Sequence, residues 1–201
     1  MFHRLIGRVI LLFLVLGTLL ALVACTAAPV TPTSVPTLLP TPTPMVASDC
    51  PSVTQGTQLL TNEESGYCLL YPDGYTPVDP LPGEVCFVPG DTSMECHSAN
   101  LIIEMENANG RTPSQIADEL IAEAETAGPG IEIQRTDLTV SGEQAVMLEG
   151  VPGVDASRIV VLIHADRLYR LMFVPWDETR EEFTGVENLY NTAIDSFTFL
   201  R

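Results

Sequence analysis

Four cysteines give this sequence its clearest chemical signal. Cys50, Cys68, Cys86 and Cys96 are an even number of thiols in a segment that follows an export signal, described below, and such a set predicts two disulfide bonds. Cys86 and Cys96 flank the turn sequence Val88-Pro89-Gly90-Asp91, so we expect Cys86 to pair with Cys96 and Cys50 to pair with Cys68. Zinc binding is the alternative, but the short Cys-x2-Cys spacing of zinc sites is absent.

The histidines and serines do not have the spacing of a catalytic group. Only His97 and His164 follow Cys25; His97 shares the apolar alternation of a predicted strand, and His164 lies next to a predicted hairpin turn. The sequence has no Gly-x-Ser-x-Gly motif, the strained turn that presents a serine nucleophile in many hydrolases. We therefore interpret both histidines as structural and expect no enzymatic activity.

Carboxylates are numerous enough to form pairs by chance. Glu104 and Glu106 share one face of a predicted strand, while Glu178, Glu181 and Glu182 crowd the start of a predicted helix, where acids suit the helix dipole. No Asp-x-Asp-x-Asp-Gly loop supports calcium binding. We interpret these residues as solvated faces and expect no metal and no cofactor. Binding of a small ligand or a divalent cation is the alternative, and a hydrolase that uses a carboxylate pair is the remote one.

Three of the nine arginines, Arg158, Arg167 and Arg170, form the only basic cluster in the sequence, on a predicted hairpin. Pairing across the strands with the excess of acids explains this cluster, and contact with an anion or a partner is the alternative hypothesis. Trp176 is the single tryptophan, and we interpret it as a core residue.

The N-terminus predicts export and a lipid anchor. Residues 1–8 carry two arginines and no acid, an apolar run follows to about residue 23, and Leu22-Val23-Ala24-Cys25 is typical of a bacterial lipobox. This run is shorter than the about 20 residues of a spanning helix. We therefore predict a signal peptide over residues 1–25 and lipidation of Cys25; an uncleaved N-terminal anchor is the alternative. Two or more acyl chains would hold the protein durably on a membrane.

Both interpretations of the N-terminus place the rest of the chain outside the cytoplasm. Thr26, rather than an aspartate, follows the cysteine. In a two-membrane cell this pattern favours the outer membrane, and in a one-membrane cell the outer leaflet of the cell membrane.

Residues 26–48 have the composition of a tether. They contain six prolines, six threonines and no charge, which favours polyproline II and excludes a packed core. At about 3.1 Å per residue, the fully extended segment would span on the order of 70 Å. We predict a disordered, semi-rigid spacer; a proline-rich docking site or an O-glycosylated stalk is the alternative.

Residues 49–201 have the size of a single domain, and they are strongly acidic. All 26 acidic residues lie in this segment, two of the nine arginines precede Cys25 and lysine is absent, so the chain from Cys25 onward has a formal charge of −19. A field of this sign repels nucleic acid and anionic lipid headgroups. We therefore expect no binding of nucleic acid and either a soluble surface domain or one with a basic partner.

Apolar periodicity predicts strands, a helix, further strands and a last helix in this segment. A capping box of Thr112 and Gln115, with Pro113 between them, opens the first helix, and Asp177 is expected to cap the second. The prolines between residues 77 and 82 indicate a loop. The predicted strands cover 66–71, 84–88, 94–106, 131–140, 143–149, 157–164 and 167–174, and residues 196–200 form a short strand or the end of the helix.

This order predicts an α+β fold in which helices pack on a twisted antiparallel sheet of about six to seven strands. Tyr71-Pro72-Asp73-Gly74-Tyr75, the mid-chain helix, Leu168-Tyr169-Arg170-Leu171 and Asp195-Ser196-Phe197-Thr198-Phe199 together resemble the Mog1/PsbP-like fold of many small bacterial lipoproteins. The resemblance spans about residues 66–200. It implies a binding or assembly-assisting module without shared catalytic residues. We therefore expect a lipid-anchored, extracytoplasmic module that is held on the membrane through Cys25 and binds a protein or envelope partner.

Overall fold

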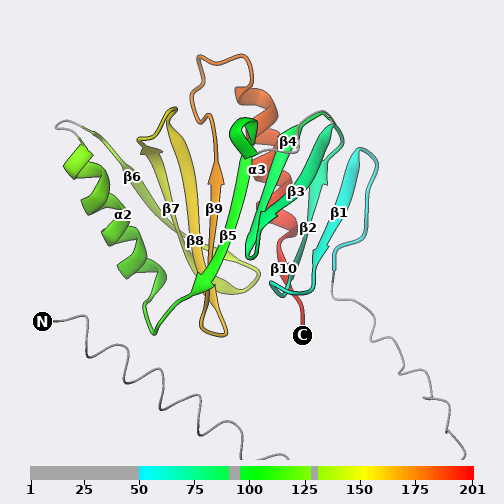
Figure 1. Cartoon of the computed structure of the whole chain (residues 1–201), viewed down its shortest axis with the longest axis horizontal. Coiled ribbons are helices and arrows are strands. Elements are labelled where there is room, and N and C mark those ends of the chain that lie inside the picture. Colours follow the sequence, from blue (N-terminus) through cyan, green and yellow to red (C-terminus); the bar gives the residue numbers. More distant parts are fainter. Residues whose placement is uncertain (1–49, 91–95, 128–130) are drawn as a thin grey trace, which may run out of the picture. The chain divides into compact units, whose positions relative to one another are not determined.

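The computed structural model describes residues 50–90, 96–127 and 131–201; the predicted signal peptide and tether lie outside them. The described residues form ten strands, two α-helices and one 3-10 helix (Figure 1). In chain order these are β1 (Thr57–Asn62), β2 (Tyr67–Pro72), β3 (Tyr75–Leu81), β4 (Glu84–Pro89), η1 (Cys96–Ser98), β5 (Leu101–Asn107), α2 (Pro113–Ala127), β6 (Gln134–Val140), β7 (Glu143–Val151), β8 (Ser157–His164), β9 (Arg167–Phe173), α3 (Phe183–Ser196) and β10 (Thr198–Phe199).

Within these residues the strands form two antiparallel sheets. The large sheet has seven strands in the order β3-β4-β5-β9-β8-β7-β6, and the small sheet has three in the order β1-β2-β10. Neighbouring strands are antiparallel in both sheets. The predicted α+β class is therefore confirmed. The second sheet was not predicted, because its outer strand β1 is polar and largely exposed.

One face of the large sheet forms the main core together with α3 and the small sheet. Leu101, Ile103, Leu171 and Phe173 alternate toward this face on the adjacent strands β5 and β9, and none is more than 1% exposed. The facing residues of α3 keep the predicted helical spacing and are fully buried: Val186, Leu189 and Ala193. The period-two and helical patterns of the sequence therefore meet in one core.

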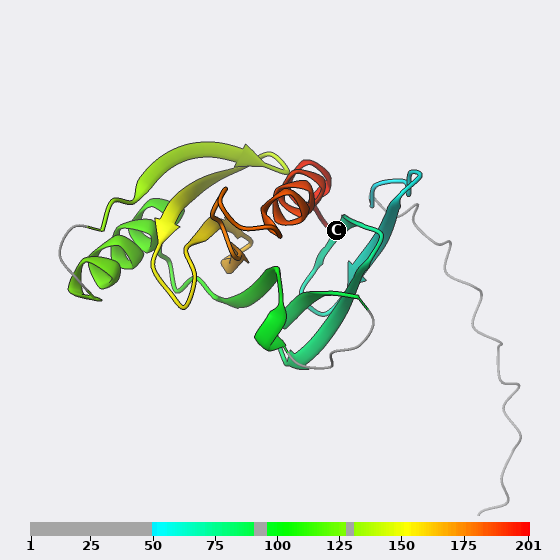
Figure 2. The same ribbon diagram turned by 90° about the horizontal axis from the view of Figure 1, so that it is seen from above.

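Helix α2 covers only one end of the opposite face. It packs on β7 and β8 through Ile116 and Ala117, which contact Leu148 and Val161 in a second buried cluster. Figure 2 shows α2 and α3 on opposite sides of the strands. The predicted capping box is present, since the Thr112 amide donates to Gln115 Oε1 at 2.8 Å and the Gln115 amide donates to Thr112 Oγ1 at 3.3 Å.

The strand predicted over residues 94–106 is shorter in the structure. Residues 91–95 lie outside the described residues, Cys96–Ser98 forms η1, and the strand begins at Leu101. The Asn100 amide donates to the Phe87 carbonyl at 2.9 Å, and the Asn100 side chain donates to the Val174 carbonyl at 2.9 Å. These tertiary hydrogen bonds, together with the Cys86–Cys96 disulfide, override the apolar alternation that suggested a continuous strand.

The loop predicted from Pro77, Pro80 and Pro82 is instead strand β3 and its turn into β4. Strand β3 forms an edge of the large sheet, where a residue without an amide hydrogen removes no ladder bond. The turn depends on Gly83, whose φ is +81°. A Cβ atom at Gly83 would lie 2.9 Å from the Met105 carbonyl oxygen, so only glycine fits this close approach.

Asp177 caps a turn and not α3, which begins six residues later, at Phe183. The Asp177 Oδ1 atom accepts hydrogen bonds from the Thr179 amide at 2.9 Å and from the Thr179 hydroxyl at 2.8 Å. These bonds hold the pKa of Asp177 below its usual range, because they favour the charged carboxylate. The end of the chain does form a strand, β10, which pairs with β2.

Two buried tyrosines join the small sheet to the large one and provide a matched test of the core. The Tyr67 and Tyr169 rings meet edge to face with centroids 5.9 Å apart, and each residue is 1% exposed. The Tyr169 hydroxyl donates to the Ser65 carbonyl at 2.7 Å. The Tyr67 hydroxyl has no hydrogen-bond partner among the described residues, and burial raises the pKa of Tyr67 far above its usual range.

Tyr169→Phe is expected to lower the free energy of unfolding by about 1.5 kcal/mol, because it leaves the buried Ser65 carbonyl without its donor. Tyr67→Phe removes a hydroxyl that is already unpaired, so we expect a change within about 0.5 kcal/mol of zero or a slight stabilisation. Urea unfolding at neutral pH measures both. Equal losses in the two variants would contradict this account of the tyrosines.

Candidate functional site

The four cysteines form the two disulfides expected from the sequence. Cys50 joins Cys68 with a Cα–Cα distance of 5.7 Å, and Cys86 joins Cys96 at 5.6 Å. Cys86 is in β4 and Cys96 is in η1, so within the described residues the second bond does not join two paired strands. Glu84 lies close enough to Cys86 and Cys96 for the three side chains to resemble a metal site, with ligand atoms within 4.8 Å. Because a disulfide has no thiolate to donate, this group does not form a metal site in the oxidised protein.

The structure does not bring the three arginines of the predicted cluster together. Arg158 pairs with Phe173 across β8 and β9, and Arg167 begins β9 at the opposite end of the hairpin. Arg170 has the opposite parity on β9 and therefore points to the other face of the sheet. The three arginines therefore share no common surface, and a single anion or partner could not contact all of them at once.

Each of these arginines has its own partners. Arg158 forms an ion pair with Glu149, and its guanidinium lies 3.5 Å from the centroid of the Trp176 ring and 4.3 Å from that of Tyr190. Arg167 donates to the Glu64 carbonyl at 3.2 Å. The first arrangement places a cation between two aromatic faces, which stabilises the packing of α3 on the sheet and leaves Arg158 little freedom to bind a ligand. Trp176 is therefore a partly buried core residue.

The two histidines lie in different elements, His164 at the end of β8 and His97 in η1. The His164 Nδ1 atom lies 2.8 Å from Glu143 Oε1, and the His164 ring stacks on Phe199 with centroids 4.0 Å apart. His97 is exposed in η1 and does not share the apolar face expected for it. His164 therefore connects the β7–β8 edge to the C-terminal strand.

The part of the large sheet between α2 and η1 forms an open groove. Helix α2 covers β7 and β8, and η1 lies beside β4 through the Cys86–Cys96 bond, so the part of β5 and β9 around Ile102 and Met172 is only partly covered on that face. The hollow has a volume of about 790 Å³. We call it the β5–β9 groove. Its walls are α2, η1, the loop 151–155 and the segment 174–182.

The floor of the β5–β9 groove consists of two rows of residues that are directly paired across strands. Ile102, Met172 and Ile159 are opposite one another on β5, β9 and β8 and form an apolar row. The next row has Glu104 opposite Arg170. Leu120 of α2 borders the floor, and Val154 of the 151–155 loop is fully exposed at its rim. An apolar strip beside a charged row can hold the side chains of a polypeptide.

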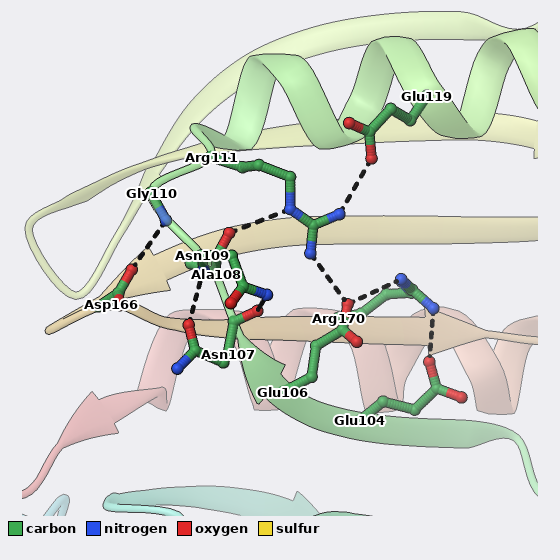
Figure 3. A network of polar contacts seen from close by, with 10 residues as sticks. All are labelled: Glu104, Glu106, Asn107, Ala108, Asn109, Gly110, Arg111, Glu119, Asp166 and Arg170. Carbon is green, nitrogen blue, oxygen red and sulfur yellow. Dashed lines mark hydrogen bonds and ion pairs between the residues drawn. The ribbon is translucent and has the colours of Figure 1, made fainter.

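A network of ion pairs joins β5, β9 and the start of α2 (Figure 3). Arg170 Nη1 lies 2.8 Å from Glu104 Oε2, and Arg170 Nη2 lies 3.6 Å from Glu106 Oε1. Arg111, just before α2, forms two further ion pairs. Its Nη2 atom lies 3.6 Å from Glu106 Oε1, and its Nη1 atom lies 3.0 Å from Glu119 Oε2. Glu104 and Glu106, the carboxylate pair predicted on β5, therefore form ion pairs with arginines at the surface.

Arg170 has one donor that this network leaves unpaired. Its Nε atom is buried and has no hydrogen-bond partner within the described residues.

The acids predicted near the second helix are exposed, and one of them, Glu182, faces Arg180 at 3.6 Å.

Sequence reasoning missed the groove, although one signal was visible. Ile102 lies on the otherwise polar face of its strand, between Asn100 and Glu104, and it pairs with Met172 on the face of β9 that also carries Arg170 and the buried Leu168. An apolar residue at a polar position of an alternating strand indicates that something packs there. The sequence does not show that α2 leaves Ile102 and Met172 partly exposed, because the position of α2 on the sheet depends on tertiary structure.

Neither α-helix in the described part of the chain is long and apolar enough to cross a membrane.

Comparisons with known proteins give a match among solved structures and no family. No family model matches the chain, and no curated protein matches it. Among solved structures, the solution structure of cyanobacterial PsbP (CyanoP) from Synechocystis sp. PCC 6803 is similar, with a TM-score of 0.48 and 19% sequence identity over 75% of this chain and 96% of that chain.

Proposed function

We propose that the protein is a lipid-anchored, extracytoplasmic binding module without catalysis, and that it contacts a protein partner of the cell envelope through the β5–β9 groove. The observation that carries the proposal is the partly exposed floor of the groove. Two apolar side chains, Ile102 and Met172, are partly exposed beside the buried Ile159, on a sheet whose other face packs against α3 and the small sheet. Leaving such a strip uncovered is costly in water unless a partner covers it.

The sequence supports the anchor and the location. The pattern Leu22-Val23-Ala24-Cys25 favours cleavage and lipidation, and the uncharged, proline-rich residues 26–48 would lift the domain away from the membrane surface. Two disulfides suit an oxidising compartment. A lipid-held domain meets its partners in the plane of the membrane, so modest affinity is sufficient.

Cys25→Ser tests the anchor. The variant is expected to lose membrane retention completely and to appear in the soluble extracytoplasmic fraction, or in the medium of a one-membrane cell, because no acyl chain can be attached. Cell fractionation followed by mass analysis of the N-terminus measures this. A Cys25→Ser chain that is processed and still held on the membrane would contradict the proposal.

A photoreactive amino acid tests the groove. Placed at Val154, on the groove rim, it is expected to yield one recurrent adduct with an envelope protein in intact cells. Val53 is the matched control, because it is an exposed valine of the same domain that does not line the groove. The proposal fails if position 154 gives no adduct, or if position 53 gives the same one.

A further inference from the structure

Two more hollows continue the β5–β9 groove around the β3–β4 turn. The nearer hollow, of about 290 Å³, shares Glu104 and Arg170 with the groove. The farther hollow, of about 550 Å³, shares residues 81–84 with the nearer one and ends at the β1–β2 turn. Each hollow shares lining residues with the next, so the three adjoin one another, and we call them together the acidic track.

The acidic track is strongly negative even for this acidic domain. Nine carboxylates and two arginines line it; the carboxylates are Glu63, Glu64, Asp79, Glu84, Glu104, Glu106, Glu123, Asp155 and Glu182. Both arginines are already neutralised, Arg170 by two of these glutamates and Arg180 by Asp155 and Glu182. Five acids of the track form no ion pair within the described residues, so a hollow surface of one sign is left to attract cations.

Apolar side chains interrupt the acidic track at intervals. The row of Ile102, Met172 and Ile159 forms the floor of the groove. Leu81, between the two smaller hollows, is 62% exposed, and Val154 at the far end is fully exposed. Carboxylates line the same three hollows, so the surface has both apolar and anionic contact points.

We propose that the acidic track binds an extended, cationic segment of the partner protein, in which lysine or arginine side chains alternate with apolar ones. This inference rests on the proposed function and specifies the chemistry of the partner. The track spans three connected hollows, which suits an extended chain better than a metal ion or one small molecule. Anionic lipids and nucleic acid would be repelled by the same field.

Designed peptides test the charge requirement. The probe is a fluorescein-labelled 12-residue peptide of three Lys-Leu-Ser-Gly repeats, and the protein is the full lipidated chain in nanodiscs of phosphatidylcholine, with empty nanodiscs as the blank. Fluorescence anisotropy is expected to show saturable binding that weakens with added salt. A peptide with Gln for Lys is expected to bind at least ten-fold more weakly, and one with Ser for Leu several-fold more weakly.

Charge reversals locate the site. Glu123→Arg, on the groove wall, and Glu63→Arg, at the opposite end of the track, are each expected to weaken binding of the Lys-Leu peptide at least five-fold. Glu187→Arg is the matched control, because it changes the charge equally at an exposed position of α3 that does not line the track. The affinity of the Glu187→Arg variant for the peptide should stay within two-fold of that of the unmodified protein. Melting temperatures of the three variants show that each is folded.

Three results would overturn the inference: no binding of the Lys-Leu peptide, equal binding of the Gln peptide, or an equal effect of Glu187→Arg. The last would mean that overall charge, and not the track, attracts the peptide. Failure here is distinguishable from failure of the proposed function. An adduct at position 154 without peptide binding keeps a groove-binding partner but rejects a cationic one, whereas the absence of that adduct rejects the groove itself.

Discussion

Phe173→Ala is expected to lower the free energy of unfolding by about 4 kcal/mol, within the range for emptying a fully buried aromatic position. Phe173 is 0% exposed and lies at the end of β9, opposite Leu101 of β5 and Arg158 of β8. Its ring meets the Tyr190 ring of α3 edge to face, with centroids 5.1 Å apart. The residue therefore joins the central strands to α3, and alanine would leave a cavity that rigid neighbours on both sides cannot fill.

Denaturant unfolding measures this effect, and Val154→Ala is the control. Val154 is apolar and exposed, so truncating it should change the free energy of unfolding by less than about 0.5 kcal/mol. A loss below about 1 kcal/mol for Phe173→Ala would mean that α3 does not pack on β9 as the structure has it.

The part of the fold predicted from sequence is the part in which local pattern and tertiary structure agree. The strand Ser157–His164 has the predicted bounds, and α2 begins with the predicted capping box, because alternation and capping are properties of neighbouring residues. Strands β1 and β3 were missed for the opposite reason. Strand β1 is polar and depends on its pairing with β2, while β3 tolerates proline only because it is an edge.

The candidate site was not predicted, because no local pattern defines it. The disulfide pairing followed from the number and spacing of the cysteines, but its consequence, the placement of η1 over β4, did not. The arginines are close in sequence, yet strand parity sends Arg170 to the face opposite Arg158. The groove consists of residues from six separate segments, and only the sheet order brings β5 and β9 together.

The wall of the β5–β9 groove depends on a covalent bond. None of the three residues of η1 is buried, and only Cys96 among them packs against the small cluster of Cys86, Val88 and Ala99. A turn with so little buried surface has little packing energy of its own. The Cys86–Cys96 disulfide therefore acts with the hydrogen bonds of Asn100 to keep η1 opposite α2, and the stability of the domain is coupled to the shape of its groove.

Replacing Cys86 and Cys96 together with alanine is expected to lower the free energy of unfolding by about 3 kcal/mol, since the bond closes a loop between residues ten positions apart. The same variant should bind the Lys-Leu peptide at least three-fold more weakly under conditions where the domain is still folded, because η1 loses its covalent bond to β4. Urea unfolding and fluorescence anisotropy measure the two effects separately.

The matched control is the replacement of Cys50 and Cys68 with alanine. This bond closes a loop between residues 18 positions apart, so the expected loss of stability is also about 3 kcal/mol. It ties the first described residue to β2, away from the groove, and peptide binding by the folded protein should not change. If both variants weaken the peptide equally, general destabilisation explains the loss; if only the Cys86 and Cys96 variant does, the disulfide shapes the binding surface.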